Sequence, residues 1–176
     1  MRSAVVKASF ATMTDIRGEV VAAAESQIGL SEPEPYWLAC NVERPFPPAW
    51  CGAFALWSLK RAGLACAWDW QIGRGFLWRL TLTSSPQIGD IAYFAKHQHH
   101  AVVSAFLIPS RQPFAGHVST VETNEYYAKT DPPSHVELVN GNGKDGRVTQ
   151  TVTPTRYVTA FYSIDRLLTP SELPSV

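Results

Sequence analysis

The chain has 176 residues, of which 45% are hydrophobic and 17% are charged. This balance excludes a disordered chain and predicts a single domain over residues 1–176, with a core at about 14–165. Fifteen basic and fifteen acidic residues give a formal net charge of zero, so the overall charge favours neither nucleic acid nor an anionic membrane as a partner. No stretch approaches the roughly 20 apolar residues that cross a bilayer, and we expect a soluble protein without a membrane partner.

The N-terminus and the cysteines bear on the cellular compartment. Arg2 and Lys7 interrupt the apolar residues at the start of the chain, so we expect synthesis in the cytoplasm without a classical signal peptide. The three cysteines, Cys40, Cys51 and Cys66, are too few for a disulfide framework. Cys40 and Cys66 could pair in an oxidising compartment, which would leave Cys51 as a free thiol.

The first part of the chain is predicted to be helical. Residues 15–28 carry an apolar residue at every fourth position and end before a glycine, which indicates an amphipathic helix capped by Asp15 or Thr14. The five prolines of residues 31–48 predict an extended connector without regular helix. The connector leads to a helix over 51–62, which is apolar on nearly every side and is therefore expected in the middle of the fold.

The second part of the chain is predicted to form strands. Residues 68–82 are rich in tryptophan and glycine without a clean period, which predicts an irregular or short helical insert. Short β-branched or aromatic runs follow, divided by Gly, Pro, Asn and Asp, and they predict strands at 90–94, 101–108, 118–122, 136–139, 148–152 and 158–164. Helices followed by strands indicate an α+β fold, in which the buried helix packs on one face of an antiparallel sheet or small barrel.

Cys51 is the candidate nucleophile because it begins the expected buried helix. Unpaired N–H groups and the macrodipole at a helix N-terminus stabilise a thiolate. His97, His99 and His100 directly precede a predicted strand and are candidates for the proton acceptor. Since side chains alternate along a strand, His99 shares a face with Ala101 and other small residues, which would admit a helix closely. This argument points His99 at Cys51 and His100 away from it, and a shift of one residue in the pleat would exchange them.

Asn140 and Asn142 are the candidates for a third group that holds the imidazole. Both lie in an Asn-Gly-Asn-Gly run at the end of the next expected strand. An amide oxygen that accepts the imidazole N–H fixes the tautomer, and this suffices where the nucleophile is an already acidic thiol. The same run could instead be an ordinary turn, because Asn and Gly dominate turns.

Four short motifs occur in order along about residues 15–165. They are Trp50-Cys51-x-x-Phe54, Gly89-Asp90 at the start of a strand, His99 two places before Ala101, and Asn140-Gly141-Asn142. This pattern resembles the papain-like CHAP and NlpC-type peptidoglycan hydrolases. In that family the last motif commonly begins with an acid, which Asn140 replaces here.

The resemblance implies a papain-like α+β fold and a cysteine amidase or endopeptidase that cuts an amide bond of bacterial peptidoglycan through a thioester. It assigns catalysis to Cys51, His99 and Asn140, with His100, Asn142 and Trp50 as supporting or alternative residues, and it implies no cofactor and no metal. We expect a monomer that reaches the cell wall by phage lysis or specialised secretion, and an inhibitor, immunity or delivery protein could accompany it.

Other interpretations compete with this one. The resemblance also extends to papain-like acyltransferases and to inactive modules that bind wall fragments, because a fold does not fix an activity. A lone cysteine in an apolar helix is usually an inert core residue. A metal cluster of His97, His99 and His100 is disfavoured, because no cysteine or carboxylate lies at ligand spacing and adjacent strand residues face opposite ways.

Overall fold

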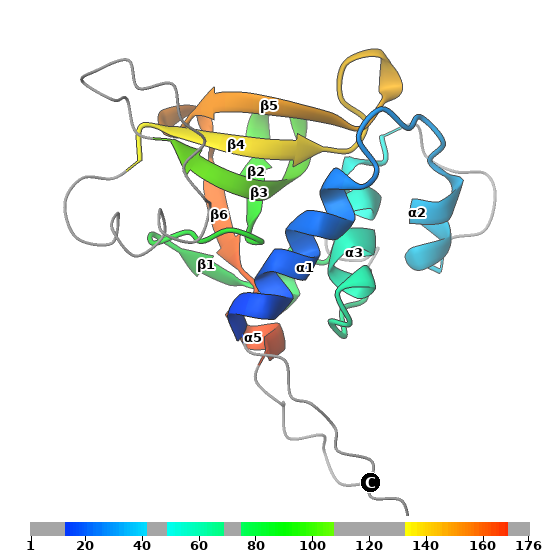
Figure 1. Cartoon of the computed structure of the whole chain (residues 1–176), viewed down its shortest axis with the longest axis horizontal. Helices are drawn as coiled ribbons and strands as arrows, with labels where there is room; N and C mark the ends of the chain where they lie inside the picture. Colours follow the sequence, from blue (N-terminus) through cyan, green and yellow to red (C-terminus); the bar gives the residue numbers. More distant parts are fainter. Residues whose placement is uncertain (1–12, 42–48, 69–74, 108–132, 169–176) are drawn as a thin grey trace, which may run out of the picture.

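The computed structural model describes residues 13–41, 49–68, 75–107 and 133–168 (Figure 1). Its helices are α1 (Met13–Glu25), α2 (Glu34–Ala39), α3 (Cys51–Arg61) and α5 (Asp165–Leu168), and its strands are β1 (Thr81–Thr83), β2 (Ile91–Phe94), β3 (His99–Leu107), β4 (His135–Asn140), β5 (Thr149–Pro154) and β6 (Ala160–Ser163). The predicted α+β class is therefore confirmed. None of the described helices combines the length and the apolarity that crossing a membrane would need.

The strands form one six-stranded sheet in the order β1-β6-β2-β3-β4-β5, and all the neighbouring strands pair antiparallel. The start of β3 is central to the site. Ala101 of β3 is paired with Asn140 at the end of β4, so these two side chains point to the same face of the sheet. His99 lies two residues before Ala101 and therefore shares that face with Asn140.

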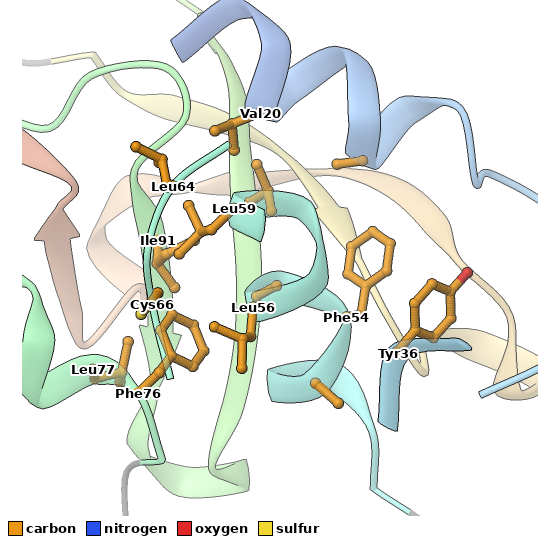
Figure 2. Close-up of a cluster of buried hydrophobic side chains, with 14 of the residues drawn as sticks. Val20, Tyr36, Phe54, Leu56, Leu59, Leu64, Cys66, Phe76, Leu77 and Ile91 are labelled. Atoms are coloured by element: carbon orange, nitrogen blue, oxygen red, sulfur yellow. The ribbon is translucent and has the colours of Figure 1, made fainter. Parts of the chain in front are cut away.

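The helices α1, α2 and α3 gather on one side of the sheet, and α1 and α3 contact β3 (Figure 1). Figure 2 shows the core between these layers, where Leu56 and Leu59 of α3 lie against Ile91 of β2. Eight of the eleven residues of α3 are buried, as the apolar sequence predicted. The helix ends at Arg61 with Ala62 as its C-cap residue, and Gly63 adopts a left-handed φ of 83°, which a glycine tolerates at a helix C-terminus.

The face of β3 that packs on the helices is not the one predicted. Val102 belongs to the core shared with α3, whereas Ala101 and Val103 belong to a second cluster on the opposite face, together with Phe106. The prediction assumed that a helix needs small residues beneath it. In the structure, larger aliphatic and aromatic side chains fill the space between α3 and the sheet, so the face of Val102 and His100 is the helix face.

The connector after α1 also differs from the prediction, because residues 34–39 form α2. Pro33 is the N-cap residue and Pro35 lies in the first turn. At these positions the backbone N–H has no partner within the helix, so proline does not disturb it. Tyr36 and Trp37 are buried, and this burial explains why so short a helix forms.

Smaller differences concern the element bounds. The first helix begins at Met13, so Thr14 and Asp15 lie inside it instead of capping it, and it ends at Glu25. Strand β1 and helix α5 were not predicted. The strand expected at 118–122 and the central part of the expected insert at 68–82 lie outside the described residues.

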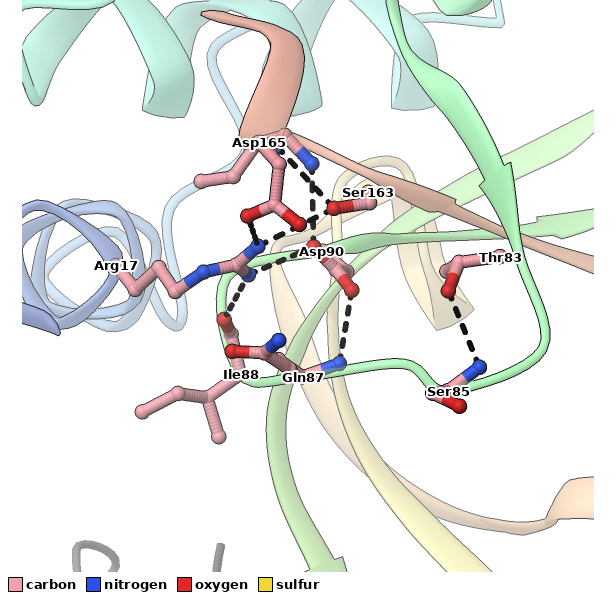
Figure 3. A network of polar contacts seen from close by, with 9 residues as sticks. Arg17, Thr83, Ser85, Gln87, Ile88, Asp90, Ser163 and Asp165 are labelled. Atoms are coloured by element: carbon pink, nitrogen blue, oxygen red, sulfur yellow. Dashed lines mark hydrogen bonds and ion pairs between the residues drawn. The ribbon is translucent and has the colours of Figure 1, made fainter. Parts of the chain in front are cut away.

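A buried ion-pair network joins α1 to the sheet (Figure 3). The guanidinium of Arg17 donates to Asp90 Oδ1 at 2.7 Å, to the Ile88 carbonyl at 2.8 Å, to Asp165 Oδ1 at 2.6 Å and to Ser163 Oγ at 3.3 Å. Asp90 is therefore a structural residue that fixes the start of β2 against α1.

Candidate active site

Cys51 is the first residue of α3, and the side chain of the N-cap residue, Trp50, makes no capping hydrogen bond. The first backbone N–H groups of a helix have no partners within it. Cys51 lines an open pocket of about 430 Å³. The residues around this pocket are Ala49, Cys51, Phe94, His97, His99, Asn140 and Asn142. A thiol at a helix N-terminus therefore faces a space that can hold part of a small molecule or peptide.

His99 and Asn140 form a hydrogen-bonded pair in the same pocket. Nε2 of His99 lies 3.0 Å from Oδ1 of Asn140. The Asn140 amide nitrogen donates to the Leu138 carbonyl at 3.1 Å, to the Thr149 carbonyl at 3.4 Å and to Thr151 Oγ1 at 2.9 Å. These three acceptors hold the amide nitrogen away from the imidazole, so Oδ1 must face the ring. Nε2 of His99 consequently carries a hydrogen, and in the neutral ring Nδ1 is the proton acceptor.

The structure distinguishes between the two asparagines. Asn140 accepts from the imidazole, whereas Asn142 lines the pocket from the turn after β4, where it adopts a left-handed φ of 54°. Gly141 between them lies so close to α3 that a Cβ there would overlap the Cβ of Phe54. This close contact fixes the end of β4 against the helix that carries Cys51.

Both His99 and His100 lower the pKa of the Cys51 thiol, and His100 hydrogen-bonds to its sulfur. The sulfur lies 3.9 Å from Nδ1 of His100 and 3.9 Å from the carbonyl oxygen of Gln98. The prediction that His100 points away from Cys51 is therefore wrong, because the helix face of β3 is the His100 face. His99 lines the pocket and His100 does not, so the two rings approach the sulfur from different sides.

The electrostatics of the site favour a thiolate beside an imidazolium. Burial raises the pKa of the Cys51 thiol, but the hydrogen bonds and charges of His100 and His99 outweigh burial and lower this pKa to about 5. Burial lowers the pKa of His99, but the hydrogen bond and charge of Cys51, together with the hydrogen bond of Asn140, raise this pKa above its ordinary value. The proton therefore moves from sulfur to His99 near neutral pH.

No family model matches the chain, and no curated protein or solved structure gives a significant match to it. Among the described residues, no group of three His, Cys, Asp or Glu side chains is arranged to hold a metal ion, and His97 is an exposed residue of the pocket wall.

The other two cysteines differ from Cys51 in their electrostatics. Cys40 and Cys66 are buried free thiols. Burial raises the pKa of Cys40 to about 12 and that of Cys66 to about 11, so both stay protonated at neutral pH. The pairing that the sequence left open is not formed in this structure. Of the three thiols, only Cys51 has the lowered pKa that a nucleophile requires.

Three further residues shape the site in ways that the sequence did not predict. Trp50, the N-cap residue before Cys51, is buried in the core and stacks on Tyr36, with ring centroids 5.1 Å apart. Gln98 adopts a left-handed φ of 48° directly before His99, and its carbonyl faces the sulfur. A Cβ on Gly52 would lie 2.8 Å from the Trp68 ring and 3.2 Å from Nδ1 of His100. The glycine after Cys51 was the one available signal for this close packing.

Proposed function

We propose that this protein is a papain-like cysteine hydrolase of the NlpC/CHAP type that cleaves an amide bond. The observation that carries the proposal is the His99–Asn140 hydrogen bond of 3.0 Å in the pocket that Cys51 also lines. A nucleophile, a base and a group that orients the base form the arrangement that acyl transfer needs.

The proposed reaction uses Cys51 and His99 in each half, while Asn140 holds the imidazole in place. The Cys51 thiolate attacks the scissile carbonyl carbon, and the charge that develops on the carbonyl oxygen is stabilised by the N–H groups at the start of α3. The C–N bond then breaks, and His99 donates its proton to the leaving amine, which yields a thioester. In the second half, water attacks the thioester carbon and gives its proton to His99. The Cys51 thiolate leaves, and a free carboxylic acid is released.

The proposed substrate is the peptide part of bacterial peptidoglycan, cut either between the sugar and the stem peptide or within the peptides. The support for this substrate is the motif order that resembles the CHAP and NlpC-type hydrolases. This substrate would place the action of the protein at the cell wall, in the periplasm or outside the cell.

Digestion of purified sacculi tests the proposal. We expect wild-type protein to release soluble fragments with new carboxyl termini, identified by mass spectrometry, and Cys51→Ser to release none. Cys66→Ser is the matched control, because Cys66 is a buried thiol outside the pocket, and it should keep the activity. Amine-capped products in the presence of an added amine would indicate an acyltransferase instead. Wall fragments that bind equally to Cys51→Ala without any cleavage would indicate an inactive binding module.

A further inference from the structure

His100 contacts Cys51 from the interior of the protein. The residue is 6% exposed, and its ring lies between Phe76 and Tyr93, at centroid distances of 5.8 Å and 5.1 Å. Nδ1 lies 3.9 Å from the Cys51 sulfur. The other nitrogen, Nε2, is buried and has no hydrogen-bond partner among the residues that the structure describes. The imidazole is thus oriented with one nitrogen on the sulfur and the other in an apolar environment.

The packing around the sulfur depends on this arrangement. Gly52 follows Cys51 in the first turn of α3, and a Cβ at this position would lie 3.2 Å from Nδ1 of His100, closer than side chains normally approach. The absence of a side chain at Gly52 therefore permits the start of α3 to approach the His100 ring. The contact between His100 and Cys51 therefore depends on the close approach of the backbone at Gly52 as well as on the two side chains.

His100 is poorly suited to act as a second general base. It does not line the pocket, so it cannot reach a leaving amine there, whereas His99 can. Its Nε2 has no described partner that would fix the tautomer in the way that Asn140 fixes His99. A nitrogen that faces a thiolate and cannot pass a proton to the substrate can still stabilise the anion as a hydrogen-bond donor.

We propose that His100 is a positioning residue whose Nδ1–H donates a hydrogen bond to the Cys51 thiolate from the core side. This donor holds the sulfur at the floor of the pocket and favours the anion, while the transferred proton stays on His99. The titratable groups that face the His100 ring are Cys51 from α3 and Tyr93 from β2, and its neighbour in β3 is His99. The inference rests on the proposed function only in taking Cys51 as the nucleophile.

The rate of Cys51 alkylation by iodoacetamide as a function of pH tests the proposal without any substrate. We expect His100→Leu to raise the apparent pKa of the Cys51 thiol by about one unit, a roughly tenfold loss of thiolate below that pKa. We expect His100→Asn to restore at least half of the shift, because the asparagine Nδ2 can occupy the place of the imidazole Nδ1. Cys40→Ser and Cys66→Ser in the background confine alkylation to Cys51. His135→Leu, at the far end of the sheet opposite Leu107, is the control and should leave the pKa unchanged.

An unchanged thiol pKa in folded His100→Leu would overturn the proposal. So would a rise that His100→Asn does not restore, since packing rather than a donor would then be responsible. If His100→Leu does not fold, the imidazole ¹⁵N shifts of the wild-type protein decide the question. A hydrogen on Nδ1 of His100 supports the proposal, and a hydrogen on Nε2 alone overturns it. Normal alkylation without sacculus cleavage would contradict the proposed function and leave this inference intact.

Discussion

Replacement of Asn140 by alanine removes the acceptor that orients His99. In the structure this acceptor is Oδ1, at 3.0 Å from Nε2, and the bond is strongest when His99 carries the proton from Cys51. A hydrogen bond to a charged group contributes roughly 1.5–3 kcal/mol. Its loss should lower kcat/KM about 10- to 150-fold, because this acceptor both orients the His99 ring and stabilises its protonated form.

A matched control comes from the other side of the same amide. Thr151→Val removes one of the three acceptors of the Asn140 amide nitrogen, the hydroxyl at 2.9 Å, and leaves the carbonyls of Leu138 and Thr149. The amide should keep its orientation, so we expect a loss of less than about threefold, within the value of one neutral hydrogen bond. Asn140→Asp should not restore activity, because a carboxylate oxygen would face those carbonyls without a hydrogen to donate.

Initial rates of fragment release from labelled sacculi measure these effects, and thermal unfolding shows whether each variant is folded. Wild-type kcat/KM in Asn140→Ala would refute the assignment of Asn140 to the base. An equal loss in Thr151→Val and in Asn140→Ala would refute the argument that Oδ1, rather than the packing of the whole side chain, carries the effect.

Two further predictions follow from the charges. The pH profile of kcat/KM should rise near the Cys51 pKa of about 5, as the thiol ionises. It should fall only above the ordinary histidine pKa of about 6.5, because the pKa of His99 is raised. A fall in kcat/KM that begins below a pH of about 6.5 would contradict the thiolate–imidazolium pair. Arg17→Leu should lower the free energy of unfolding in urea by about 3–5 kcal/mol, because it leaves Asp90, whose side chain is 1% exposed, without its cation. Asp165→Asn, at a side chain 48% exposed, should cost less than about 1 kcal/mol, and equal losses in the two variants would contradict this account.

Elements with a strong local signal were predictable from the sequence. Helix α3 is apolar all round and stops at a glycine, and β2 to β6 are β-branched or aromatic runs between turn residues. Helix α2 was missed because prolines forbid only the interior of a helix, and both of its prolines lie at the start. Strand β1 has only three residues and is largely exposed; it exists through its pairing with β6, which no local pattern encodes.

Residue chemistry and motif order were enough to predict which side chains line the candidate site together. Cys51, His99 and Asn140 were predicted, and the structure brings them to one pocket. The contact of His100 with the sulfur was not predicted. The alternation of side chains along β3 defines two faces of the strand, but it does not indicate which face the helices cover. The packing of the whole core, in which Val102 and Ile91 pack towards α3, determines which face of β3 the helices cover.

The strand register determines which of two adjacent histidines is hydrogen-bonded to Asn140. Alternation along β3 puts His99 on the face of Asn140 and His100 on the face of the helices. The pairing of Ala101 with Asn140 and the contact of Gly141 with Phe54 hold this register. A slip of one residue between β3 and β4 would move Asn140 to the face of His100 and leave His99 without this hydrogen-bond acceptor. The two histidines therefore differ in their surroundings, although both lower the pKa of the same thiol.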